Sequence, residues 1–98
     1  MPYAIIAKDK PGSTGLRAEL RPAHVEHLTR HATKVLAAGP LLADDAATPI
    51  GSLIILDTED RAELDAFIAA DPYTEGGLFQ SVTVMPWRKV ILGGKRDA

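Results

Sequence analysis

Two stretches with helical features separate four short apolar stretches in this chain of 98 residues. The apolar stretches lie at residues 3–7, 41–43, 51–56 and 78–85, and turn-forming residues flank them, which is typical of β-strands. The order is therefore β-α-β-β-α-β, the ferredoxin-like arrangement of an α+β domain with an antiparallel sheet. This length indicates one domain, so residues 1–98 are assigned to a single domain.

The first helical stretch runs from Arg17 to Ala38. Steps of three and four residues predict one stripe along it: Leu20, His24, Leu28, His31 and Val35. The regular helix is expected to begin near Pro22, because the first turn tolerates a missing N–H, with residues 16–21 as a separate turn. Gly39-Pro40 is expected to end the helix, since glycine permits a left-handed cap and proline cannot continue a helix.

The second helical stretch has its expected N-cap in the segment that begins at Thr58. It directs three side chains inwards, namely Leu64, Phe67 and Ile68. Asp71-Pro72 is expected to end it, because the residue before a proline avoids the α region.

The connections are less strongly specified. Residues 44–49 are expected to form a hairpin loop between the two middle strands. Residues 11–15, the sequence PGSTG, suit either a lid or a simple connection. A short strand is expected at residues 90–92, followed by a frayed tail.

The predicted helices leave one of the two faces of the sheet uncovered. Two helices cover only one face of a four-stranded antiparallel sheet. The sheet of a second copy would cover the other face without lengthening the chain. We therefore expect a homodimer.

Composition and charge argue against several classes of partner. The net charge is −2, and Lys95-Arg96 is too short a basic run to follow a nucleic-acid backbone. Apolar runs such as residues 53–56 are far too short to span a membrane, and the first residues show no secretory signal. The chain has no cysteine, which excludes disulfides and thiol chemistry and fits a cytoplasmic location.

The three histidines all lie in the first helical stretch. His27 and His31 stand four residues apart, which is the spacing of a two-histidine metal pair. Glu26 lies outside that pair, however, and there is no H-E-x-x-H motif. The favoured interpretation is a solvated or half-buried helix face, and we expect neither a metal nor another cofactor.

His24 has more suggestive neighbours. Arg21 lies one turn before it on the same side of the helix. A histidine that acts as a base needs a partner to set its tautomer, and a carboxylate usually does so. Asp71, at the end of the second helix and before a proline, is the best candidate. The alternative is that Asp71 only bonds its own backbone in a turn.

Two further residues are candidates for binding a substrate. Tyr73 lies two positions beyond Asp71 and offers a hydroxyl, although it can equally be a packing aromatic residue. Ser52 follows Gly51 at the start of a strand, where it either binds a polar ligand atom or caps the loop. Gly76-Gly77 lacks the lysine of a phosphate-binding loop, and no G-x-S-x-G motif occurs.

Several short segments, in order over about residues 2–92, together resemble one known family. They are Tyr3 to Asp9 (YAIIAKD), Arg21 to Val25 (RPAHV), Ala38 to Leu41 (AGPL), Gly51-Ser52, Asp71 to Tyr73 (DPY) and Val84 to Trp87 (VMPW). In this combination the chain is similar to the YciI-like, or YCII-related, family of the dimeric α+β barrel superfamily. The resemblance implies a ferredoxin-like dimer, which forms an α/β barrel, with a histidine–aspartate pair in a pocket. The matching positions here are His24 and Asp71.

The resemblance also implies a class of chemistry. One relative class is a dehydrochlorinase acting on a chlorinated hydroxyquinol, and the wider superfamily includes muconolactone isomerases. Both move a proton on a small oxygenated ring without a cofactor. We therefore expect a cofactor-independent lyase or isomerase in which His24 moves the proton and Asp71 orients the imidazole of His24. Arg21 or Ser52 would bind the oxyanion, and Tyr73 would line the pocket.

Two alternatives stay open at this stage. The first is a non-catalytic module, or accessory subunit, that binds a small polar aromatic molecule in the same pocket. The second is a purely structural dimerisation domain.

Overall fold

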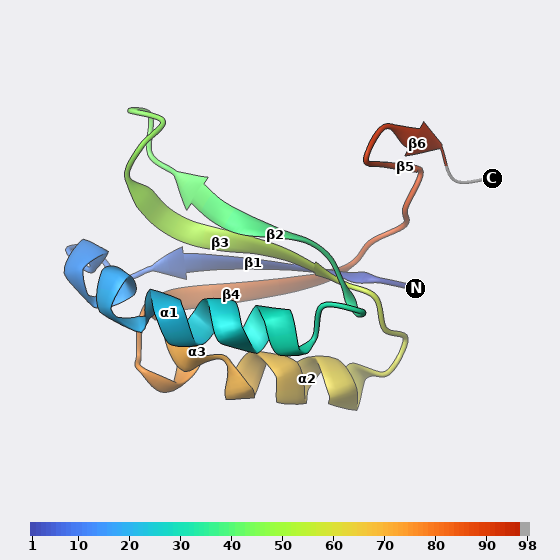
Figure 1. Ribbon diagram of the computed structural model, residues 1–98, viewed down its shortest axis with the longest axis horizontal. Coiled ribbons are helices and arrows are strands. Elements are labelled where there is room, and N and C mark those ends of the chain that lie inside the picture. The colour runs from blue at the N-terminus through green and yellow to red at the C-terminus, as the bar shows by residue number, and fades with distance from the viewer. Residues whose placement is uncertain (97–98) are drawn as a thin grey trace.

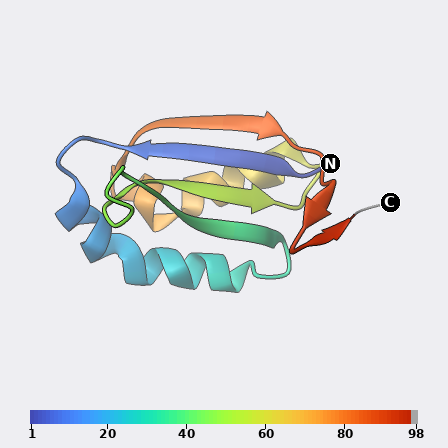
Figure 2. The ribbon, with the colours of Figure 1, turned by 90° about the horizontal axis from the view of Figure 1, so that it is seen from above.

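The computed structural model describes residues 1–96 and shows one antiparallel sheet with its helices on one face (Figures 1 and 2). The elements of this layered body are β1 (Tyr3–Asp9), α1 (Thr14–Arg30), β2 (Val35–Leu42), β3 (Pro49–Leu56), α2 (Arg61–Ala70), α3 (Pro72–Glu75) and β4 (Phe79–Pro86). The strand order is β2-β3-β1-β4, with every neighbouring pair antiparallel. This is the predicted α+β architecture.

The core lies between the sheet and the helices. Ile5 of β1 pairs with Ile54 of β3, and both are buried against α2, where Leu64 and Phe67 complete the cluster. On the opposite face of the same strands, Ile6 pairs with Leu53, which is 37% exposed. Among residues 1–96 no element lies over that opposite face (Figure 1). The sheet therefore has one covered and one open side.

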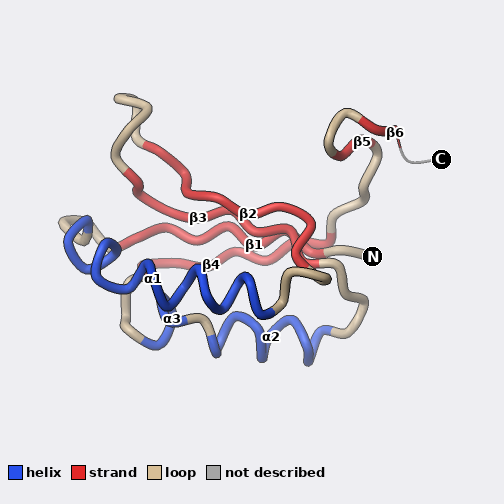
Figure 3. Tube along the Cα trace, in the orientation of Figure 1, coloured by secondary structure: helices blue, strands red, loops and turns tan. Residues whose placement is uncertain are grey.

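The first helix differs from its predicted extent at both ends. α1 begins at Thr14 and ends at Arg30, so the predicted span of Arg17 to Ala38 is wrong, and residues 35–42 form strand β2 instead. Pro22 lies inside the helix rather than at its start. Proline removes one helical hydrogen bond, and the first turns of α1 slant away from the rest of the helix (Figure 3).

Gly39-Pro40, expected to end a helix, lies in the middle of β2. Pro40 pairs there with Ser52 of β3. A proline is tolerated because β2 is an edge strand, where one side of the strand needs no hydrogen-bond donor. Pairing with β3 thus overrides the helix-ending signal of the local sequence.

The second helix begins and ends close to the prediction. Its N-cap is Asp60, whose carboxylate accepts from the Ala62 N–H at 2.9 Å, while Thr58 accepts from the Asp60 N–H at 3.1 Å. Asp71 ends α2 as predicted and is also the N-cap of the short helix α3. Asp71 is therefore held between two helices.

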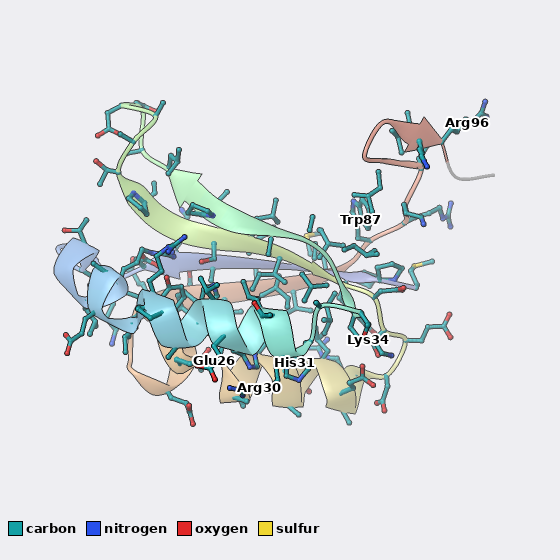
Figure 4. All side chains as sticks on the ribbon, in the orientation of Figure 1. Glu26, Arg30, His31, Lys34, Trp87 and Arg96 are labelled. Atoms are coloured by element: carbon teal, nitrogen blue, oxygen red, sulfur yellow. The ribbon has the colours of Figure 1, made fainter. Side chains whose placement is uncertain are left out.

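The tail forms a separate hairpin. After Trp87 the chain leaves the main sheet, and β5 (Ile91–Leu92) pairs only with β6 (Lys95–Arg96), apart from the main body (Figure 4). The short strand expected at 90–92 thus exists, but in a second sheet. Residues 93–96, expected to belong to a frayed tail, form the turn and the second strand of this hairpin, and residues 97–98 lie outside the described part of the chain.

Candidate functional site

His24 and Asp71 lie in direct contact. His24 Nδ1 is 2.8 Å from Asp71 Oδ1 and 3.0 Å from Oδ2, and both residues are buried. Asp71 Oδ1 also accepts from the Tyr73 N–H at 2.9 Å, which fixes the carboxylate at the junction of α2 and α3. A carboxylate only accepts, so Nδ1 of His24 carries the proton, and Nε2 has no protein partner among residues 1–96.

Tyr73 packs flat against this imidazole. The two ring centroids are 3.9 Å apart with 15° between the ring planes, so the tyrosine restricts the tilt of His24. Tyr73 is fully buried, and burial raises the pKa of its hydroxyl despite the opposing charges of Arg17 and Arg21. The hydroxyl therefore stays protonated and able to donate.

Arg17, like its partner Asp9, is a residue that sequence reasoning missed. It lies two turns before His24 on α1, and it is buried. Its guanidinium donates to both oxygens of Asp9, at 2.7 and 3.1 Å, and to Ser52 Oγ at 2.7 Å. A longer contact of 3.4 Å reaches the Tyr73 hydroxyl. The available signal was the seven-residue spacing of Arg17 and His24, which places both on one helix face.

Ser52 reaches this network because Gly51 lets β3 approach β1 closely. A Cβ added at Gly51 would lie 2.4 Å from the carbonyl oxygen of Ala7. Glycine is required at that position, and the next residue, Ser52, is buried beside Arg17.

These side chains border a cavity of about 360 Å³ between α1 and β2. Arg17, His24, Ser52 and Tyr73 line it, together with Arg21, which is exposed. Apolar walls come from both elements, including Leu28 of α1 and Pro40 of β2. The cavity has the volume and the mixed lining of a site for one small molecule. The predicted site residues other than Asp71 thus border one cavity, and Asp71 contacts it through His24.

The other two histidines have structural partners. His27 Nε2 donates to the Phe67 carbonyl at 3.0 Å, and His31 Nδ1 donates to the His27 carbonyl at 2.9 Å. His31 meets Phe67 edge-on, between the end of α1 and α2 (Figure 4). Within residues 1–96 no three histidine, aspartate or glutamate side chains gather as metal ligands would.

His27 makes the folded state sensitive to acid. Burial lowers the pKa of its imidazole below the usual 6.5. Below about pH 6.5 His27 therefore binds a proton in the unfolded chain but not in the folded chain. The free energy of unfolding then decreases as the pH falls, until the pKa of folded His27 is reached, by at most about 1.4 kcal/mol per pH unit for one proton. Unfolding by urea, measured at about pH 7.5 and about pH 5.5, should show a smaller acid loss for His27→Gln than for the natural protein.

Glutamine keeps a donor for the Phe67 carbonyl but does not titrate. Equal acid losses in His27→Gln and in the natural protein would contradict this account.

No helix within residues 1–96 has the length and apolar character needed to cross a membrane.

Residues 1–88 match the model of the YCII-related domain. The chain is 36% identical over 98 residues to protein YciI of Escherichia coli O6:H1, which covers 93% of this chain and all of the relative.

Solved structures extend the comparison. The 5-chloro-2-hydroxyhydroquinone dehydrochlorinase TftG of Burkholderia phenoliruptrix, in complex with 2,5-dihydroxybenzoquinone, is 33% identical with a TM-score of 0.83, covering 90% of this chain and 94% of TftG. An antibiotic biosynthesis monooxygenase, at 23% identity and a TM-score of 0.54 over 90% of this chain and 99% of its own, shares the fold alone. The match to the family model over residues 1–88 and the identity to YciI show that this chain belongs to the YCII-related family.

Proposed function

We propose that this protein is a cofactor-independent lyase or isomerase that moves a proton on a small oxygenated ring compound. The observation that carries the proposal is the state of His24. Asp71 holds Nδ1–H, so Nε2 keeps an unshared electron pair beside a cavity that also presents Arg17 and Ser52. A base next to hydrogen-bond donors suits a reaction that removes a proton and builds negative charge on oxygen.

The proposed step follows from these positions. His24 Nε2 takes a proton from the ring compound, and Asp71 stabilises the imidazolium that forms. The electron pair left behind shifts towards a ring oxygen, where donors from Arg17, Arg21, Ser52 or Tyr73 stabilise it. In an isomerase the proton returns at another carbon. In a dehydrohalogenase the electron pair forms a C=C bond while the carbon–halogen bond breaks and halide leaves.

The resemblance to TftG favours the second variant. TftG is a dehydrochlorinase of a chlorinated hydroxyhydroquinone, and it is 33% identical to this chain in a match that covers 90% of this chain. We extend to this chain the class of reaction, proton removal from a small oxygenated ring.

A ligand screen followed by a search for product tests the proposal. Chlorinated hydroquinones, hydroxyquinones and unsaturated lactones are screened by thermal shift, and each stabilising compound is then incubated with the protein. Ring isomerisation or chloride release is followed by absorbance and ion chromatography. Turnover that depends on the protein supports the proposal. Saturable binding with no product from any stabilising compound would contradict it and favour a non-catalytic binding module.

The proposal includes a homodimer that forms through the open sheet face. Leu53 and Met85, 37% and 55% exposed, lie on that face, and the ends of the β2–β3 hairpin and of the tail rise beside it (Figure 1). An equivalent sheet is the partner of matching shape and polarity, which would close the α/β barrel implied by the family.

A cytoplasmic location, expected from the cysteine-free sequence, is also part of the proposal.

A charge on the open face tests the dimer. Leu53→Asp should convert a dimer into a monomer in sedimentation equilibrium, because a buried unpaired carboxylate costs about 3–5 kcal/mol and weakens association by more than about a hundredfold. Ala69→Glu adds one charge to the exposed surface of α2 and should leave the mass unchanged. A natural protein that is monomeric at high concentration, or a Leu53→Asp variant that stays dimeric, would contradict this interface.

A further inference from the structure

The cavity beside His24 presents positive charge to a ligand. Two guanidinium groups line it, those of Arg17 and Arg21, and no carboxylate of residues 1–96 does so. The two carboxylates nearby are engaged elsewhere: Asp9 with Arg17 and Asp71 with His24. A ligand therefore meets cationic and neutral donors before it meets an acid.

The hydrogen-bond inventory shows that donors remain available. Arg17 has five N–H donors, of which the contacts to Asp9, Ser52 and Tyr73 use four. The remaining Nη1 hydrogen has no partner within residues 1–96. Ser52 accepts from Arg17, so its own hydroxyl hydrogen is free to donate, and the same holds for Tyr73. Donors of Arg17, Ser52 and Tyr73 thus border one cavity, together with a strong acceptor, His24 Nε2.

A count of charges shows what would complete the site. With His24 neutral, Asp9 balances Arg17, whereas Asp71 and Arg21 have no charged partner in contact. The other titratable groups near His24 stay uncharged, because burial raises the pKa of Tyr73 and lowers that of His27. One proton on His24 and one anionic oxygen near Arg21 would pair every remaining charge. Both are supplied together by an acidic hydroxyl group.

We propose that the cavity selects a small planar ring compound with an acidic hydroxyl and binds it as the anion. The O–H bond breaks, an N–H bond forms at His24 Nε2, and the ring oxygen keeps the electron pair beside Arg17 and Arg21. Return of that proton to a ring carbon regenerates the base that the proposed function uses. The inference rests on the proposed function for the role of His24, and it adds the substrate class: phenols and enols that ionise readily.

The test uses para-nitrophenol as a probe, because its anion is coloured and its neutral form absorbs elsewhere. Difference titrations with the natural protein are run across its ionisation range. The bound probe should ionise at a pH lower by about one unit or more, which means that the anion binds about tenfold more tightly than the neutral phenol. Para-nitroanisole, which cannot ionise, should bind at least about tenfold more weakly than para-nitrophenolate.

Arginine variants identify the source of the selection. Arg21→Gln should reduce the preference for the anion several-fold while the fold stays intact, because Arg21 is exposed. Arg30→Gln removes a guanidinium that pairs with Glu26 on the outer face of the same helix, and it should leave the preference unchanged (Figure 4). The two variants lose the same charge from one helix, so their difference reports position alone.

Three outcomes would overturn the inference. One is the absence of saturable binding of para-nitrophenol. Another is equal affinity for para-nitroanisole, or bound para-nitrophenol that ionises at its free pH. The third is tighter binding of para-nitrobenzoate than of the phenolate, which would indicate a carboxylate site. None of these measurements uses turnover. Selection of the anion can therefore be found in a protein whose catalysis does not depend on His24. Conversely, turnover can be found in a protein that does not prefer the anion.

Discussion

Replacing His24 with alanine is expected to lower turnover of any substrate found in the screen by about 10²- to 10⁴-fold, the usual contribution of a general base. The physical reason is that Nε2 of His24 borders the cavity and has no partner among residues 1–96, so it is free to accept a proton. The binding constant for the substrate should change less than the catalytic rate. Steady-state kinetics with a circular dichroism check on folding measure both.

Asp71→Asn tests the same pair in a subtler way. The amide oxygen can still accept from the Tyr73 N–H, so the junction of α2 and α3 should stay folded. Its NH₂ group would face His24 Nδ1, which favours the tautomer with the proton on Nε2 and removes the base. A comparable loss of turnover is expected. His31→Gln, at the C-cap directly after the same helix and outside the cavity lining, should turn over normally. Normal turnover in both His24→Ala and Asp71→Asn would refute the mechanism.

The largest effect on stability is expected at Arg17. Arg17→Met leaves the Asp9 carboxylate, 6% exposed, buried without its ion partner, and breaking such a pair costs about 3–5 kcal/mol. The Ser52 and Tyr73 hydroxyls lose a donor at the same time. Urea unfolding monitored by circular dichroism measures the loss in the free energy of unfolding.

A second substitution distinguishes a lost charge partner from lost packing. In Arg17→Met combined with Asp9→Asn, no uncompensated charge stays buried, so the double variant should be more stable than Arg17→Met alone. Arg21→Met makes the same change one turn later at an exposed position and should alter stability by less than about 0.5 kcal/mol. Equal losses for Arg17→Met and Arg21→Met would show that the Asp9–Arg17 pair contributes nothing.

The Arg17 network also accounts for how the site is held open. Small domains usually bury apolar side chains, yet the buried side chains of α1 are polar: Arg17, His24 and His27. Each of them has a partner on another element: Asp9 on β1, Asp71 after α2, and the Phe67 carbonyl. A polar helix face whose buried side chains are each bonded to another element keeps a fixed shape without closing the space beside it.

Local patterns predicted the element order, and the reason is that strands and helices here carry clear boundaries. Asp71-Pro72 ended a helix as expected, because the restriction on the residue before proline acts locally. The pattern failed at residues 31–40, where a stripe that included His31 and Val35 extended the helix too far. Pairing of β2 with β3 decides that segment, and the partner strand lies outside any local window.

The amino-acid sequence by itself determined the α+β order, the His24 and Asp71 candidates and the need to cover a second sheet face, because each depends on spacing along the chain or on residue type. Only the tertiary structure decided that Arg17 and Asp9 belong to the site and that Gly39-Pro40 lies in a cavity wall. Those facts depend on contacts between residues far apart in the chain. Such contacts form only when the sheet brings β1, β2 and β3 beside α1.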